Sequence, residues 1–210
     1  NGKMEILPGV LNGPVGWFKL PENISAYNDE SEEKVVKLIT DSLNAADSQI
    51  DFSQYDKNND GIVDHVFIIH AGNDNAVSGN SDDIWSMCVS SSPFAFGRYD
   101  NKKVDSVVIC AEDPDFKINT KDAVYIGIFC HEFTHDLGAP DLYDYDDPKM
   151  EPVGFWCLMS LGAYSGNAQY PAHLCGYLKM DLDGNSKNGI SSLGLPWNTI
   201  TTDGTYSINA

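Results

Sequence analysis

The stretch at residues 131–141, which reads HEFTHDLGAPD, constrains the fold of this 210-residue chain more than any other feature. On a helix, the four-residue spacing of His131 and His135 places both imidazoles on one face, about 6 Å apart. Two of their nitrogens can then occupy two corners of a tetrahedron around Zn²⁺. Gly138 lets the backbone reverse after the helix, so that Asp141 can return as a third ligand. The stretch therefore predicts a helix that ends before Gly138 and a zinc site at its end.

Glu132 follows the first histidine of this pattern. Its side chain is turned aside from the metal but lies close to a water molecule beside it, where it can serve as a general base. Three protein ligands also leave a fourth position open, which is typical of catalytic rather than structural zinc sites. Glu151 is an alternative third ligand, but Pro152 disfavours a helical conformation at Glu151, so Asp141 is favoured.

A methionine downstream supports the same site. Residues 154–160, GFWCLMS, precede Gly162 in a turn-like context. In metzincins a Met-turn lies beneath the metal at a comparable distance from the zinc-binding helix. Met159 is therefore predicted to lie under the metal, although a lone methionine more often fills a core. Tyr164 is a candidate for stabilising an oxyanion, with packing in the core as its more common role.

A second pattern of metal ligands occupies residues 56–64, DKNNDGIVD. Oxygen donors at alternate positions can wrap a hard cation such as Ca²⁺, and Gly61 permits the sharp turn. The predicted calcium ligands are the side chains of Asp56, Asn58, Asp60 and Asp64 and the backbone carbonyl of Ile62. Phe67 stands where an EF-hand has its bidentate glutamate, so the loop leads directly into a strand. The alternative interpretation is an Asx-rich turn without metal.

The remaining histidines and the cysteines add no further metal motif. His65 and His70 fall in or at the end of a predicted strand and His173 lies near a predicted helix start, and each is interpreted as a structural side chain. The five cysteines are scattered without a CxxC pair, so at least one stays unpaired if the others form disulfides. Burial as small hydrophobic side chains explains them equally well. Cysteine usage therefore leaves the cellular compartment open.

Charge and hydropathy exclude two classes of partner. The chain has 13 Lys and Arg residues against 31 Asp and Glu residues, a formal net charge of −18. Such a surface repels nucleic acid and anionic lipid headgroups, so neither is expected as a partner. The longest apolar runs, such as residues 123–130, are shorter than the ~18 residues that a membrane span needs. The chain starts at Asn1 without a methionine, which is interpreted as processing or trimming.

Hydrophobic periodicity predicts an α/β chain that forms one domain over residues 1–210. Predicted helices cover residues 29–46, 122–137 and 171–182, and predicted strands cover residues 62–70, 84–89 and 104–111. Ser31 can cap the first helix, and Pro171 lies in the first turn of the third. The strand at 84–89 is expected at a sheet edge. Residues 200–209 are typical of a hairpin, so residues from about 198 to 210 are interpreted as the start of a β-rich domain.

Taken together, these segments resemble the immune inhibitor A family of secreted bacterial zinc metalloproteases. The most specific match is HEFTHDLGAPDLYD at residues 131–144. The other matching segments lie at residues 51–53, 55–56, 60–61, 63–64, 66–72, 84–86, 158–160 and 171–174. The likeness extends roughly from Trp17 to the end of the chain. One departure is Met87, which stands where the family commonly has a histidine after Ile-Trp-Ser.

The resemblance implies a metzincin-like α/β fold, with a twisted mixed β-sheet, helices above an active-site cleft and a smaller irregular lower lobe. It also implies secretion, calcium dependence and further domains in the full-length chain, which is expected to be a monomer. The expected activity is zinc-dependent hydrolysis of peptide bonds in extracellular proteins, with Glu132 as the base. Two alternatives stay open. One is a catalytically degenerate binding module, which the intact Glu132 disfavours, and the other is a zinc amidase acting on a non-protein substrate such as peptidoglycan.

Overall fold

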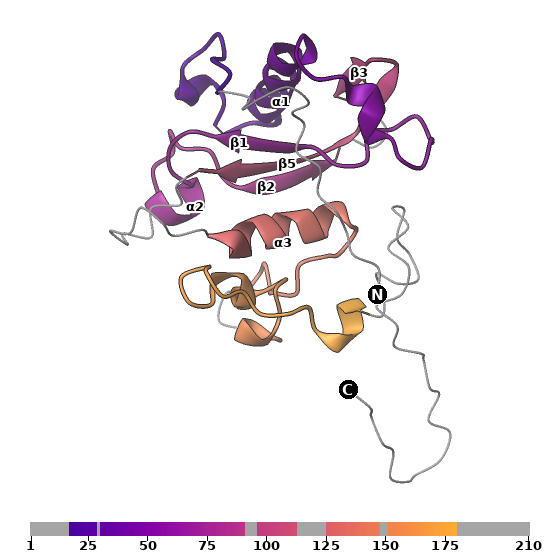
Figure 1. Cartoon of the computed structure of the whole chain (residues 1–210). Coiled ribbons are helices and arrows are strands. Elements are labelled where there is room, and N and C mark those ends of the chain that lie inside the picture. Colours follow the sequence, from indigo (N-terminus) through magenta and orange to yellow (C-terminus); the bar gives the residue numbers. More distant parts are fainter. Residues whose placement is uncertain (1–16, 29, 91–95, 113–124, 148–150, 180–210) are drawn as a thin grey trace.

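A small mixed β-sheet forms the centre of the structure (Figure 1). The computed structural model describes residues 17–28, 30–90, 96–112, 125–147 and 151–179. The sheet has the order β1-β5-β2, and its strands are β1 (Phe67–His70), β5 (Ser106–Ala111) and β2 (Met87–Ser90). β1 runs parallel to β5, and β2 runs antiparallel to it. Within the described residues the sheet is therefore mixed, as predicted, and β2 lies at one of its edges.

The predicted strands are longer than the observed ones. Of the predicted strand at residues 62–70, only β1 is regular, and the chain before it makes an isolated bridge between Ile62 and Lys103. The prediction at residues 104–111 spans two strands, because β4 (Lys102–Val104) pairs with β3 (Gly97–Tyr99) before β5 begins. A run of β-branched residues indicates strand propensity, but it does not indicate where the pairing partner changes.

Helices cover both faces of this sheet. α1 (Glu32–Asp47) lies on one side of the strands and α3 (Ile126–Asp136) on the other (Figure 1). Val107 and Ile109 of β5 belong to the core cluster that α1 covers, while α3 packs against β5 and β2. Burial on both faces explains why β5 is a continuous apolar run rather than an alternating one.

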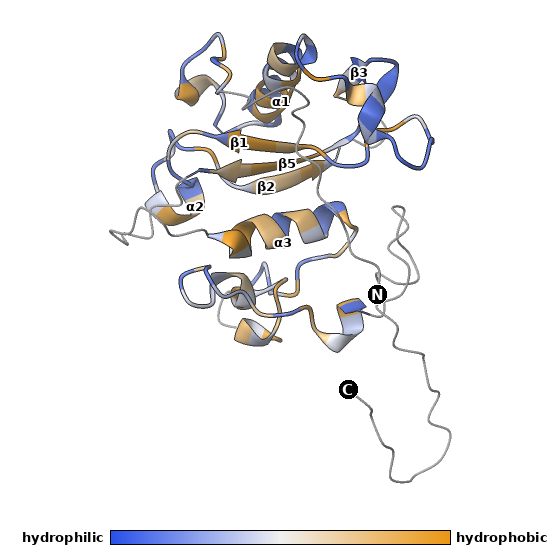
Figure 2. Cartoon of the chain, in the orientation of Figure 1, coloured by the Kyte–Doolittle hydropathy of each residue, from blue (hydrophilic) through white to orange (hydrophobic). Residues whose placement is uncertain are grey.

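α1 begins and faces inward as the sequence predicts. The Ser31 side chain accepts a hydrogen bond from the Lys34 amide, which satisfies one of the donors that a helix start leaves unpaired. The buried residues of the helix are Val35, Leu38, Ile39, Leu43 and Ala46. Figure 2 shows this apolar face turned toward the strands and the polar face turned outward. The helix therefore contributes to the core through the 3.6-residue period of its apolar residues.

α3 carries the predicted metal pattern and ends where the sequence predicts. Its last helical residue is Asp136, and Leu137 caps it. Gly138 adopts a φ of 101°, a conformation that L side chains rarely adopt and that glycine adopts readily. The chain can therefore reverse directly after the helix. The predicted start at residues 122–124 lies outside the described residues, and the described helix begins at Ile126.

After α3 the described chain forms an irregular layer on the side of the helix away from the sheet (Figure 1). Its described elements are η3 (Gly154–Trp156), η4 (Leu161–Tyr164) and a helical turn at residues 176–179. The layer approaches α3 closely because Gly127 has no side chain. A Cβ atom at Gly127 would lie 2.0 Å from the Ala163 carbonyl oxygen. The first turn of α3 therefore rests directly on this layer.

The prediction of a helix that begins at Pro171 is wrong. Residues 171–175 are not helical, and the helical turn begins only at Gly176. The backbone of this stretch pairs with the preceding turn instead, since the Ala172 amide donates to the Gly162 carbonyl over 2.9 Å. A helix starting at Pro171 would have broken this pairing.

The other described elements are short, namely η1 (Ile24–Ala26), η2 (Phe52–Tyr55) and α2 (Asn75–Ser78). Among the described residues, no helix combines the length and apolar character that crossing a membrane requires. All five cysteines are free thiols. The predicted hairpin at residues 200–209 and the predicted further domain from about residue 198 lie outside the described residues.

Candidate metal centre

The two histidines of α3 are held in one tautomer by backbone carbonyls. Nδ1 of His131 lies 2.9 Å from the Leu158 carbonyl oxygen, and Nδ1 of His135 lies 2.8 Å from the Ala139 carbonyl oxygen. A carbonyl oxygen only accepts hydrogen bonds, so Nδ1 carries the proton in each neutral ring. The Nε2 atoms are thereby left with free lone pairs, which is the form that binds a metal.

Asp141 returns to these lone pairs after the reversal at Gly138. Its Oδ1 atom lies 3.1 Å from Nε2 of His131 and 3.2 Å from Nε2 of His135. The two Nε2 atoms are themselves 3.2 Å apart. Tetrahedral ligands with bonds of 2.0–2.1 Å would lie about 3.3–3.4 Å from one another. In the part of the chain that the structure describes, these three side chains are the one His, Cys, Asp or Glu group close enough to share a metal ion.

With both rings neutral and protonated at Nδ1, three lone pairs converge at one point. The buried Oδ1 atom of Asp141 accepts no hydrogen bond, despite the nearby ring nitrogens. An unpaired buried acceptor of this kind is costly unless a cation compensates it. Two imidazole nitrogens and one carboxylate oxygen are a donor set that suits Zn²⁺ and leaves coordination open for a further ligand. The residues present therefore fit a zinc ion.

The electrostatics of the three side chains favour a cation at the same point. Burial alone would lower the pKa of His135, but the Asp141 carboxylate and the Ala139 carbonyl outweigh it and raise this pKa. Burial likewise opposes ionisation of Asp141, yet His131, His135 and Tyr145 hold its pKa well below the usual range. Asp141 therefore stays an anion. A proton and a metal ion compete for the same lone pairs, so metal binding should weaken in acid.

Tyr145 orients the carboxylate of the candidate third ligand. Its hydroxyl donates a short hydrogen bond to Oδ2 of Asp141, which leaves Oδ1 facing the imidazoles. This bond, followed by burial, raises the pKa of Tyr145, so the hydroxyl remains a donor. Sequence reasoning missed Tyr145. The one available signal was its position four residues after Asp141, which is not diagnostic outside a helix.

Glu132 lies beside the centre but is not one of its three converging donors. It is a buried residue. Burial raises the pKa of its carboxyl group to about 7, against the opposing effect of His131 and His135. The Cys88 backbone amide of β2 donates to this carboxyl group and so anchors it to the edge strand. A carboxyl group whose pKa lies near neutrality can both take and return a proton.

The layer beneath α3 fixes the first histidine. Met159 is fully buried, and its carbonyl accepts a 2.7 Å hydrogen bond from the Leu142 amide. The preceding residue, Leu158, supplies the carbonyl that accepts from His131. The turn at residues 157–160 thus packs beneath α3 and also fixes the imidazole ring of His131.

Glu151 and Tyr164, which the sequence offered as an alternative ligand and as an oxyanion stabiliser, belong to the irregular layer after α3. Glu151 accepts a 3.1 Å hydrogen bond from the Ser160 hydroxyl and is not part of the three-residue group. Tyr164 is 40% exposed. Burial raises the pKa of Tyr164, and the carboxylates of Asp74, Glu132 and Asp141 add to this effect. The Tyr164 hydroxyl therefore lies within the electrostatic field of the centre.

The sequence matches a known family over most of its length. Residues 10–186 match the family described as "Immune inhibitor A peptidase M6, catalytic domain". The chain belongs to this family. The resemblance inferred from the short motifs is thus confirmed, and the M6 family is one of metallopeptidases.

Two curated relatives illustrate the match. Immune inhibitor A of Bacillus thuringiensis subsp. alesti is 37% identical over 178 residues, which cover 71% of this chain and 26% of the relative. The pre-pro-metalloprotease PrtV of Vibrio cholerae serotype O1 is 29% identical over 182 residues, covering 72% of this chain and 19% of the relative. The chain thus spans about a quarter or less of the length of these relatives.

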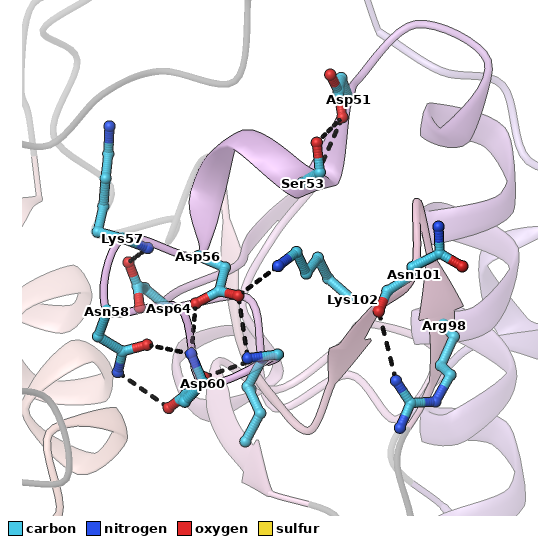
Figure 3. A network of polar contacts seen from close by, with 12 residues as sticks. Asp51, Ser53, Asp56, Lys57, Asn58, Asp60, Asp64, Arg98, Asn101 and Lys102 are labelled. Carbon is cyan, nitrogen blue, oxygen red and sulfur yellow. Dashed lines mark hydrogen bonds and ion pairs between the residues drawn. The ribbon is translucent and has the colours of Figure 1, made fainter.

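The Asp-rich loop of this M6 domain is an ordered turn (Figure 3). Asp56 accepts from the amides of Asp60 and Gly61, each over 3.0 Å, and Lys102 places its ammonium 2.6 Å from Oδ2 of Asp56. Lys102 and these amides hold the pKa of Asp56 below its usual range, Lys102 having the larger effect.

The other oxygens of the loop serve its own backbone. Asp60 accepts from the Ile62 amide over 2.9 Å, and Asp64 accepts from the Lys57 amide over 3.0 Å. The side-chain amide of Asn58 donates a 2.9 Å hydrogen bond to the Asp60 carboxylate. The three aspartates do not converge in the way that His131, His135 and Asp141 do, at least not among the described residues. The hydrogen bonds of the loop are therefore those of an Asx-rich turn, and the calcium site stays a prediction.

The other histidines of the M6 domain lie apart from the three converging side chains. His70 is buried at the end of β1 with Nδ1 3.1 Å from the Ala71 carbonyl oxygen, and His173 is exposed. His65 lies against α3, with Nδ1 2.5 Å from Oδ2 of Asp136. None of the three belongs to a group of metal-binding side chains in the described part of the chain.

Proposed function

We propose that this chain is a zinc-dependent endopeptidase domain that hydrolyses peptide bonds in extracellular proteins. The observation that carries the proposal is the convergence of two imidazole nitrogens and one carboxylate oxygen, 3.1–3.2 Å apart, beside a buried carboxyl group. Membership of the M6 family and the name of the Vibrio relative, a metalloprotease, support a metal-dependent peptidase. Zinc as the metal and extracellular proteins as substrates are our own extension of that support.

In this proposal, His131, His135 and Asp141 hold the zinc ion. When bound there, zinc would polarise the carbonyl group of the scissile bond and lower the pKa of a water molecule. Glu132 takes the proton of the attacking water and passes it to the leaving amine. Burial suits Glu132 to this role, because it raises the pKa of the carboxyl group toward neutrality.

Groups around the centre keep these four side chains in place. The Leu158 and Ala139 carbonyls fix the two imidazole rings, Tyr145 fixes Asp141, and the Cys88 amide anchors Glu132. Outer partners of this kind typically change metal affinity or activity by 10–100-fold when they are lost. The position of Leu158 and Met159 beneath α3 supports a metzincin-like arrangement, with the turn at residues 157–160 as the predicted Met-turn.

Digestion of casein by the purified domain tests this proposal. We expect cleavage in the presence of zinc, loss of cleavage after treatment with a chelator, and recovery when zinc is added back, because the metal would polarise the scissile carbonyl group and activate the water. Peptide products are measured by mass spectrometry. A domain that binds zinc but cleaves neither casein nor peptidoglycan would instead be a binding module. Cleavage of peptidoglycan amides without cleavage of casein would identify the amidase alternative.

The Asp-rich loop gives a separate prediction about calcium. A calcium ion would have to displace the Lys102 ammonium from Asp56, where it now compensates the carboxylate. If the folded loop binds calcium, a hundredfold excess over the dissociation constant should stabilise the domain by about 2.7 kcal/mol. The melting temperature, measured by calorimetry, should therefore rise with calcium, and Asp60→Ala should remove most of the rise.

Asp82→Ala is the matched control for this experiment, because it removes the same charge from an exposed residue outside the loop. The control should keep the full calcium effect. A melting temperature that does not respond to calcium would leave the loop as a metal-free turn whose charge Lys102 balances.

A further inference from the structure

The last residue of α3 carries a buried carboxylate that is not part of the candidate metal centre. Asp136 is the last residue of α3 and directly follows His135. Its side chain is only 3% exposed. It is not one of the three converging donors, so the candidate metal centre does not account for it.

Both oxygens of Asp136 are bound by side chains from other elements. Oδ2 lies 2.5 Å from Nδ1 of His65, which precedes β1, and Oδ1 accepts a short hydrogen bond from the hydroxyl of Ser106, the first residue of β5. A carboxylate only accepts, so His65 and Ser106 are both donors. Asp136 therefore ties the end of α3 to the starts of two neighbouring strands.

His65 has a second contact with the same helix. Its ring lies edge-on to that of Phe133, with ring centroids 4.9 Å apart and an interplanar angle of 83°. Phe133 in turn contacts Phe67 of β1, with centroids 5.3 Å apart. The imidazole is thus held against the last turn of α3 by both a hydrogen bond and ring packing.

An aspartate at this position does not serve the stability of the helix itself. The C-terminal end of a helix carries partial negative charge, so an acidic side chain there is unfavourable. Burial adds a desolvation cost that only good hydrogen bonds offset. The position of Asp136 therefore indicates that it connects the end of α3 to His65 and Ser106. Its neighbours in sequence show which part of α3 this connection holds. His135 precedes it, and the reversal at Gly138 that brings Asp141 back follows within two residues.

We propose that His65 is a positioning residue for the metal centre. Through Asp136 it fixes the last turn of α3, and so keeps Nε2 of His135 and Oδ1 of Asp141 at the 3.2 Å separation that a shared metal ion requires. His65 touches neither the metal nor the substrate in this role. The inference rests on the proposed function only in so far as the centre binds zinc.

The test compares His65→Leu with His65→Asn. The asparagine side chain can place its amide nitrogen where Nδ1 of His65 lies and so donate to Asp136, whereas leucine cannot. We expect His65→Leu to weaken zinc binding about 10–100-fold, as is typical for the loss of an outer partner of a metal ligand, and His65→Asn to bind zinc more tightly than His65→Leu and close to wild type. Zinc affinity is measured by competition with a chelating dye, and the melting temperature of the zinc-free domain is measured alongside. Should the leucine variant not fold, His65→Gln takes its place, because its amide reaches a different position.

The readouts separate positioning from mere stability. A variant His65→Leu with a lower melting temperature but wild-type zinc affinity would overturn the proposal, since the contact would then be only structural. Equal losses of zinc affinity in the leucine and asparagine variants would also overturn it, because the hydrogen bond would not matter. If the wild-type domain itself binds no zinc, the proposed function fails first, which is a different result from a zinc-binding domain that is indifferent to His65.

Discussion

Replacing Glu132 with glutamine is expected to lower peptide hydrolysis at least about 100-fold, the usual weight of a positioned general base. Glutamine keeps the size of the side chain and can still accept from the Cys88 amide, but it cannot take a proton from water. The zinc content should not change, because Glu132 is not one of the three converging donors. The measurements are turnover of a peptide substrate and bound zinc by atomic absorption.

Glu33→Gln is the control for this experiment, since it makes the same change at an exposed residue in the first turn of α1. It should keep both activity and zinc. Two results contradict the assigned role of Glu132. One is a Glu132→Gln variant that keeps most of its activity, and the other is one whose zinc content falls in parallel with its activity. The second result would mean that Glu132 is a metal ligand rather than the general base.

The parts of the site that the sequence predicts are those set by local geometry. His131, Glu132 and His135 are placed by the period of one helix, and Gly138 by the positive φ that the reversal needs. Ser31 caps α1 for the same kind of reason, a short-range hydrogen bond. In each case the residues that decide the structure lie within a few positions of one another, so spacing alone is informative.

The supporting contacts could not be predicted because they join distant parts of the chain. The Leu158 carbonyl that fixes His131 lies 27 residues away in sequence, and His65 lies 71 residues from Asp136. Backbone carbonyls and amides carry no residue signature at all. Lys102 shows the same limit for the Asp-rich loop, since it meets Asp56 across 46 residues. The pattern of oxygens in the loop gave no indication that a lysine would stand among them.

The failed helix at Pro171 has a related cause. The apolar spacing of Leu174 and Leu178 suits a helix, and Leu178 is indeed fully buried. The backbone before Gly176 pairs instead with the turn at residues 158–162, which lies beneath the metal helix. Tertiary pairing thus overrides local propensity. The segment that departs from the predicted helix is thus paired with the turn whose Leu158 carbonyl fixes His131.

Asp141→Ala is expected to weaken zinc binding by more than about 100-fold, beyond the 10–100-fold that the loss of an outer partner causes. The change leaves two imidazoles and no anionic ligand, and peptide hydrolysis should be lost with the zinc. Without zinc, the variant should also lose some stability, because it lacks the Tyr145 hydrogen bond to Oδ2 of Asp141 and the contacts of Oδ1 with the two imidazoles. Because it binds zinc weakly, the variant should lose the rise in melting temperature that zinc gives to wild type.

Glu151→Ala is the decisive comparison, since Glu151 is the alternative ligand and its carboxylate faces Ser160 instead. If Asp141→Ala keeps its zinc while Glu151→Ala loses it, the third ligand is Glu151, and the contacts of Asp141 with the two imidazoles have another purpose.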